Sequence, residues 1–240
     1  METTKESPNG TNRKSAIIVG ILFFIATAVG LLSEPARGIL ATPDYLANLS
    51  ANEKQAITIA LSEFIMCILT VSITFWMYPI LRKHDEPMAL GYVVFRVLET
   101  VFFIVSVTSL LTLFTLSREF VNAGSPDASY FQTLGTLLKA VREWAGGMCA
   151  TIVFSLSALM LNYILYRSKL IPRLISGWGF IGAVLYLASG FLPLFGYGTR
   201  STIYISMETL LGLQEMVLAV WLIVKGFNPK AIAALFAKTE

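Results

Sequence analysis

Charged residues are scarce in this chain. Lys, Arg, Asp and Glu together make up 14% of the 240 residues, whereas hydrophobic residues make up 55%. A typical soluble domain has about 25% charged residues, so this composition excludes a fully water-exposed surface. The formal net charge is only +3, and the basic residues are scattered between apolar runs. Nucleic-acid-binding proteins gather basic residues on one face or arm, so no nucleic-acid partner is expected.

Cysteine and histidine are almost absent. The two cysteines, Cys67 and Cys149, both fall in apolar runs, and the single histidine, His84, lies in a charged loop. Buried cysteine usually behaves as a small hydrophobic residue, so a disulfide framework is not expected. A site built from several histidines is impossible within one chain, and no cofactor or metal is predicted. Serine and threonine are plentiful, but they have no membrane-embedded histidine to act as their base.

Long apolar runs account for the hydrophobic surplus. At 1.5 Å per helical residue, each run is long enough to cross about 30 Å of hydrocarbon. No small-x-small cleavage pattern follows the first run, so we interpret it as an uncleaved span. Backbone inside a bilayer must be helical or closed into a barrel, and these runs lack the alternation of a barrel. The predicted fold is an all-α polytopic membrane bundle of six transmembrane helices, over Ala16–Leu32, Ile57–Leu81, Met88–Leu116, Trp144–Tyr166, Ile171–Leu194 and Ile203–Val224.

The basic residues predict the orientation of these spans. With the N-terminus inside, eleven of the 18 Lys and Arg residues fall on the cytoplasmic side and six on the outer side, and Arg96 lies within a span. This asymmetry favours an N-in, C-in arrangement in the plasma (inner) membrane. The domain division is then a disordered cytoplasmic tail over 1–14, a transmembrane domain over 15–228 and a short cytoplasmic segment over 229–240.

Segments next to the spans have patterns of their own. Tyr130–Glu143 has apolar residues at helical spacing, which predicts an amphipathic helix on the outer surface or an extension of the fourth span. Gly146-Gly147 is expected to bend the junction. The two short inner hairpins, around 78–92 and 163–178, resemble each other. Either they are halves of an internal repeat of the kind that transporters use, or each simply has the anchors that a short inner hairpin needs. We favour the second interpretation.

Three stretches resemble a known family. Tyr166-Arg167-Ser168-Lys169-Leu170-Ile171-Pro172-Arg173 is similar to the Y-R-S-x-x-x-P-R hairpin of the bacterial membrane family catalogued as domain of unknown function 4386. Phe95–Glu99 and Leu218–Gly226 fit the same family, and the resemblance spans roughly residues 14–228. It implies a six-span protein of the bacterial inner membrane and brings no established activity.

Ionisable residues inside a membrane are costly, and each needs a partner or a purpose. Arg96 and Glu99 share one helix face, and Arg96 lies about 12 Å from the inner end of its span. Glu215 is at nearly the same depth in the sixth span, so the three residues are expected to meet. One cation and two carboxylates leave an excess negative charge, and one carboxyl is expected to hold a proton near neutral pH. These residues form either a ligand-binding site or a staple between the third and sixth helices.

A second ionisable group is predicted nearer the outer end. It contains three candidate ligand-binding carboxylates, Glu63, Glu208 and Glu143, and with them Glu34, Arg37 and Arg142. We expect this group to form a solvated rim, and the alternative is an outward-facing vestibule.

One motif invites a different function. Gly177-Trp178-Gly179-Phe180-Ile181-Gly182 matches a dinucleotide-binding fingerprint letter by letter, but that chemistry needs a preceding strand and a soluble crevice. We expect Gly179, Gly182 and Ala183 to permit close helix packing instead.

Three hypotheses on function therefore stand. The first is a small-molecule, ion or lipid-binding site at the buried charges, as in a transporter. The second is an accessory or structural membrane protein whose charges hold helices together, and the third and weakest is an enzyme acting on a lipid. The lipid bilayer is the one partner that the sequence predicts, and it does not predict the oligomeric state.

Overall fold

The computed structural model describes residues 8–124, 129–199 and 201–237, and helices are the only regular elements within these residues. Six helical stretches are long and apolar enough to cross a membrane, as the sequence predicted. They are α1 (Pro8–Arg37), α3 (Glu53–Leu81), α4 (Glu86–Asn122), the continuous stretch Tyr130–Ser168 that ends in α6 (Ala150–Ser168), α7 (Arg173–Ser189, extended by the turn η3, Leu192–Phe195) and α8 (Thr202–Val224).

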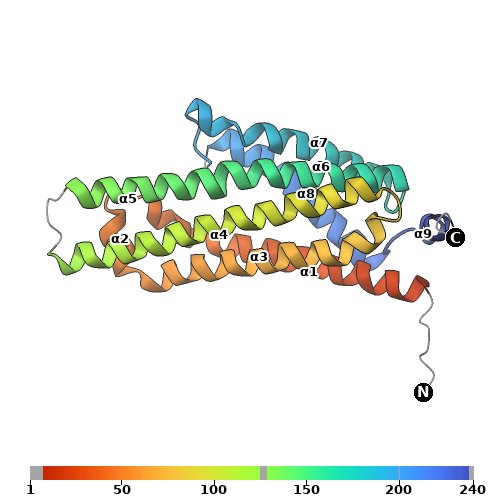
Figure 1. The fold of residues 1–240 in the computed structure, drawn as a ribbon, viewed down its shortest axis with the longest axis horizontal. Coiled ribbons are helices and arrows are strands. Elements are labelled where there is room, and N and C mark those ends of the chain that lie inside the picture. The colour runs from red at the N-terminus through yellow and green to blue at the C-terminus, as the bar shows by residue number, and fades with distance from the viewer. Residues whose placement is uncertain (1–7, 125–128, 200, 238–240) are drawn as a thin grey trace, which may run out of the picture.

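The spanning helices form a closed ring. Each packs against two neighbours, in the order α1, α3, α4, α6, α7, α8 and back to α1. Successive helices run in opposite directions, so the described chain starts and finishes at the same end of the molecule (Figure 1). We call this the terminal end; it also carries the loops at 82–85 and 169–172. The opposite end is the distal end. A ring of this kind has an interior that several helices face at once.

The outside of the ring is strongly apolar. Ile68, Phe75 and Leu174 expose 67%, 69% and 84% of their surfaces, and they are three of many large exposed hydrophobic side chains. Monomeric soluble proteins rarely expose contiguous apolar surface on this scale. Together with the six apolar helices, this surface identifies a multi-pass membrane protein.

The terminal end is ordered further than the sequence predicted. Of the tail predicted to be disordered over 1–14, residues 1–7 lie outside the described part of the structure and residues 8–14 are helical. Arg13 explains part of this difference, because its guanidinium donates hydrogen bonds to the carbonyl oxygens of Leu222, Ile223 and Val224, the unpaired last turn of α8. After α8, the helix α9 (Pro229–Ala237) covers the terminal end with buried leucine and isoleucine side chains.

The distal end projects beyond the α7–α8 hairpin (Figure 1). α4 has 37 residues and is about 55 Å long at 1.5 Å per residue, well beyond the hydrocarbon thickness. The helix α2 (Tyr45–Ala51) packs there against α4, and a short turn, η1 (Gly38–Ala41), packs against α2. Leu46, Leu49 and Leu113 are fully buried in the resulting small core. The long second and third spans therefore extend into a helical cap.

The amphipathic segment is an extension of the fourth span rather than a separate surface helix. α5 (Ser129–Arg142) continues into α6 through η2 (Glu143–Cys149), a stretch of π-helix that contains Gly146 and Gly147. A π-helical turn inserts extra backbone into an α-helix and redirects it. The small size of Gly146 matters here, because a Cβ atom on it would lie 2.6 Å from Ser106 Oγ of α4. The two glycines lie in a π-helical turn, and the bend expected at them stays a prediction.

Candidate functional site

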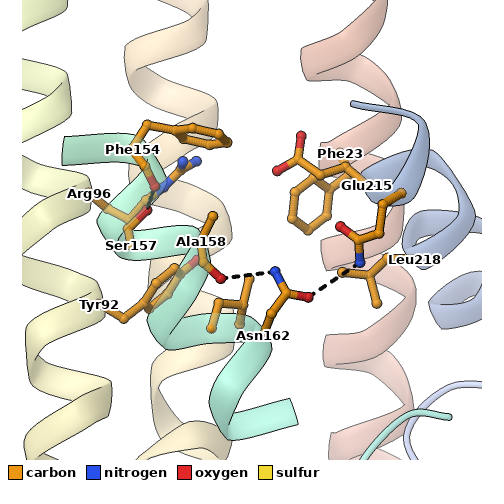
Figure 2. Close-up of a pocket in the computed structure, with 11 residues that line it drawn as sticks. Phe23, Tyr92, Arg96, Phe154, Ser157, Ala158, Asn162, Glu215 and Leu218 are labelled. Carbon is orange, nitrogen blue, oxygen red and sulfur yellow. Dashed lines mark hydrogen bonds between the residues drawn. The ribbon is translucent and has the colours of Figure 1, made fainter. Parts of the chain in front are cut away.

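The ring encloses a small cavity whose wall is mostly apolar but includes the charged residues Arg96 and Glu215. Its volume is about 10 Å³, which is room for about one water molecule. Four of the six spanning helices contribute side chains to its wall, namely α1, α4, α6 and α8. Figure 2 shows the arrangement, and the lining residues are Phe23, Tyr92, Arg96, Phe154, Ser157, Ala158, Leu161, Asn162, Gln214, Glu215 and Leu218.

Arg96 is the only cation of the cavity wall, and it is held from three helices. Its Nη1 atom lies 2.9 Å from Glu99 Oε2 on the same helix. Its Nη2 atom is 3.4 Å from Thr70 Oγ1 on α3, and its guanidinium carbon lies 5.0 Å from the ring centre of Phe154 on α6. The side chain is 7% exposed, and its Nε atom has no hydrogen-bond partner. A buried donor without a partner is costly.

Glu215 faces Arg96 across the cavity. Figure 2 shows the two side chains on opposite sides of the free space. Within the part of the chain that the structure describes, Arg96 forms a salt bridge with Glu99 and none with Glu215. The sequence predicted that the three charges would meet. They do share one site, but as an ion pair within α4 and a separate carboxylate on α8.

Two amide side chains at the same cavity were not predicted. Asn162 Nδ2 donates to the carbonyl oxygen of Ala158, and Gln214 Nε2 donates to Asn162 Oδ1 at 3.4 Å and to the carbonyl oxygen of Ile175 at 3.2 Å. Gln214 is fully buried, and its Oε1 atom has no partner. The sequence could have identified both residues, because burying an amide side chain inside an apolar span costs free energy as burying other polar groups does.

The glycine-rich start of α7 is where these amides pack. A Cβ atom on Gly179 would collide with Asn162 and Gln214, and one on Gly182 would lie 3.2 Å from the Cα atom of Leu211 in α8. Ala183 is completely buried. The prediction that these small residues permit close helix packing is confirmed, and Gly179 makes room for the amide pair.

The expected solvated rim was wrong for Glu63 and Arg142. Glu63 is 3% exposed, and both of its carboxylate oxygens accept hydrogen bonds from Arg142. Arg142 also donates to the carbonyl oxygen and the hydroxyl oxygen of Ser106, each at 3.1 Å. The length of α4 explains the difference: α3, α4 and α5 continue past the membrane-sized part, so this group is covered by helices instead of water. Ser106 is ten residues beyond Arg96, about 15 Å along the helix.

Two other carboxylates of the predicted outer group differ from Glu63 in burial. Glu143 and Glu208 have exposed side chains, and the side chains of Glu34 and Arg37 lie outside the described part of the structure. Glu208 Oε1 accepts a hydrogen bond from the Tyr186 hydroxyl at 3.3 Å.

Polar groups continue from Glu208 into the ring. The Tyr186 hydroxyl is 3.5 Å from Thr151 Oγ1, which is 2.6 Å from the Tyr204 hydroxyl. The hydroxyl chain ends at the carbonyl oxygen of Gly147, to which the Tyr204 hydroxyl donates at 3.1 Å. The link to the cavity is the ring of Tyr186, which packs edge-on against Phe154, and the ring of Phe154 also contacts Arg96.

Comparison with known proteins gives a family but no activity. The model of the family described as "Domain of unknown function (DUF4386)" matches residues 18–226. The chain belongs to this family. The match confirms the resemblance seen in the sequence. No curated protein and no solved structure matches the chain. For this DUF4386 member, the arrangement of its own residues is therefore the basis for any functional proposal.

Proposed function

We propose that this protein binds a proton or a small cation at Glu215, in the centre of the helix ring, and exchanges it with water as a transporter would. The observation that carries the proposal is the Glu215 carboxylate, which faces a buried cation across a small cavity and forms no salt bridge among the described residues. We further propose that the protein lies in a bacterial inner membrane with both termini in the cytoplasm, because of the distribution of Lys and Arg.

Charge balance supports a cationic ligand. Arg96 and Glu99 neutralise each other as a close pair, so Glu215 adds one negative charge to a low-dielectric site. Such a charge is costly unless a proton or a cation compensates it. The available space of about 10 Å³ fits a species no larger than about one water molecule. A larger ligand would need the ring to open.

The alternative, in which the charges staple helices together, has less support. A staple between the third and sixth spans needs an ion pair that joins α4 to α8. The salt bridge of Arg96 lies within α4, and α4 and α8 are not neighbours in the ring. The Arg96 Nε and Gln214 Oε1 atoms are also left without partners, which suits a binding site better than a structural contact.

The hydroxyl groups between the distal end and the cavity suggest an access route. Glu208, Tyr186, Thr151 and Tyr204 are linked by hydrogen bonds, and hydroxyl groups both donate and accept. We propose that protons or water reach the cavity from this side, with Phe154 as the last barrier.

Infrared spectroscopy of the purified protein in phospholipid vesicles tests the proposal. The pH is stepped through the neutral range, and the carbonyl stretch of a carboxyl group that gains a proton is followed. The Glu215→Gln variant removes the proposed site. Glu119→Gln is the control, because it removes an exposed carboxylate of α4 that lies outside the proposed site and route. We expect the band in wild type and in Glu119→Gln, and its loss in Glu215→Gln.

Two further arms make the result decisive. Transfer to D₂O should shift the band within seconds, because water reaches the cavity, and added sodium should remove it if a metal cation competes with the proton. An unchanged band in Glu215→Gln would refute Glu215 as the binding group. For the orientation, reporter proteins that are active only in the cytoplasm should be active at both termini, and an inactive reporter at either end would contradict it.

A further inference from the structure

A second hollow, which shares no lining residue with the central cavity, lies at the terminal end. It has a volume of about 540 Å³ and lies between the loop that joins α6 to α7 and the loop that joins α8 to α9. The two loops are tied together, because the backbone N–H of Asn228 donates to the carbonyl oxygen of Leu170 at 2.8 Å. We call this hollow the basic groove.

The basic groove carries positive charge only. Lys169, Arg173 and Lys225 line it, and none of its eleven lining residues is acidic. All three side chains are exposed, and none of them forms a salt bridge with another described residue. α7 begins at Arg173 with no side-chain cap, so its first backbone N–H groups add partial positive charge on the same side. This combination suits a phosphate group.

The surroundings favour a lipid over a soluble phosphate. Two of the cations have a strongly exposed apolar neighbour in the sequence. Leu174, next to Arg173, is 84% exposed, and Val224, next to Lys225, is 61% exposed. Trp221 lines the groove as well, and tryptophan is enriched where a membrane meets water. An anionic headgroup would therefore meet the cations while its acyl chains lie on the apolar flank.

We propose that the basic groove binds the phosphate headgroup of an anionic phospholipid. Basic pockets between the ends of membrane helices are suited to such headgroups, and each cation near the surface strengthens binding about five-fold. The proposal does not depend on ligand binding at Glu215, which lies in the ring interior.

Lys169 offers a variant that keeps the fold. Its backbone is left-handed, with φ of 56°, at the end of α6, where glycine is the favoured residue. The Lys169→Gly variant should therefore be at least as stable as wild type while it lacks one groove cation. A loss of lipid binding in this variant cannot be ascribed to unfolding.

The test is native mass spectrometry of the full-length protein from nanodiscs that contain phosphatidylglycerol and phosphatidylcholine. The retained lipids are counted for wild type, for Lys169→Gly and for the double variant Arg173→Gln/Lys225→Gln. Arg167→Gln is the matched control, since Arg167 belongs to the same hairpin and is exposed but does not line the groove.

We expect wild type and Arg167→Gln to retain phosphatidylglycerol in preference to phosphatidylcholine. Its affinity should fall about five-fold in Lys169→Gly and about twenty-five-fold in the double variant. Equal retention of both lipids, or an equal loss in Arg167→Gln, would overturn the proposal in favour of a diffuse surface charge. Displacement of the lipid by millimolar inorganic phosphate would overturn it in favour of a soluble phosphate ligand.

Discussion

At the scale of single residues, the two carboxylates next to Arg96 differ in role. Glu99 neutralises the guanidinium at 2.9 Å, whereas Glu215 stands across the cavity. Removing one partner of a buried ion pair leaves an uncompensated charge and typically costs about 3–5 kcal/mol. Glu215 is half-buried and has no salt bridge among the described residues, so removing its charge leaves no ion-pair partner uncompensated.

This difference predicts opposite effects of two matched substitutions. Glu99→Gln should lower the thermal stability of the detergent-solubilised protein strongly, because Arg96 loses its partner. Glu215→Gln should leave the melting temperature unchanged or raise it. Thermal unfolding monitored by tryptophan fluorescence measures both. If Glu215→Gln were as destabilising as Glu99→Gln, Glu215 would be an ion-pair partner and the staple hypothesis would hold.

The charged residues of the central site were predictable, and their pairing was not. Arg96, Glu99 and Glu215 stand out in apolar runs, so their cost identifies them from the sequence alone. Which carboxylate contacts Arg96 depends on the order of the helices in the ring and on the direction of each side chain. The position of a residue along its span gives neither. Asn162 and Gln214 were missed because uncharged amides stand out less in an apolar run.

At the scale of elements, the junction between α5 and α6 lies between the Glu63–Arg142 pair and the central cavity. The π-helical turn of η2 follows Arg142, which bonds to Glu63 and to Ser106. Gly146 in this turn lies against Ser106, so the backbone of the fourth span approaches α4 closely. The turn therefore fixes how the distal cap sits on the ring.

Gly146→Ala should disturb this contact. The new Cβ atom would lie 2.6 Å from Ser106 Oγ, and overpacking of this kind costs about 1–3 kcal/mol. Ser106→Gly removes the opposing side chain, so the double variant should be less destabilised than the sum of the two single variants. Thermal unfolding of the three proteins measures this coupling.

Gly212→Ala is the control for helix propensity, because a Cβ atom on Gly212 has no neighbour within 4 Å. It should be neutral or stabilise α8 by about 0.5–1 kcal/mol. Strict additivity of Gly146→Ala and Ser106→Gly would show that the two residues do not press on each other.

At the scale of the whole molecule, the six spans and their approximate ends followed from the sequence. Apolar length and the requirement for satisfied backbone groups leave few alternatives in a membrane. The ring order and the distal cap did not follow. α5 has a mixed polar and apolar pattern that suits a surface helix as well as a helix packed on α4. Its contacts with Glu63, Ser106 and Ser109 distinguish the two.

The whole-molecule account rests on a ring that encloses a hydrated, chargeable site. A high-resolution structure of the protein in a lipid nanodisc at neutral pH tests this claim most directly. We expect density for a water molecule or an ion between the Arg96 guanidinium and the Glu215 carboxylate, with Arg96 still paired to Glu99. A dry centre in which Glu215 contacts Arg96 directly, or an Arg96 side chain that faces the acyl chains, would contradict the account.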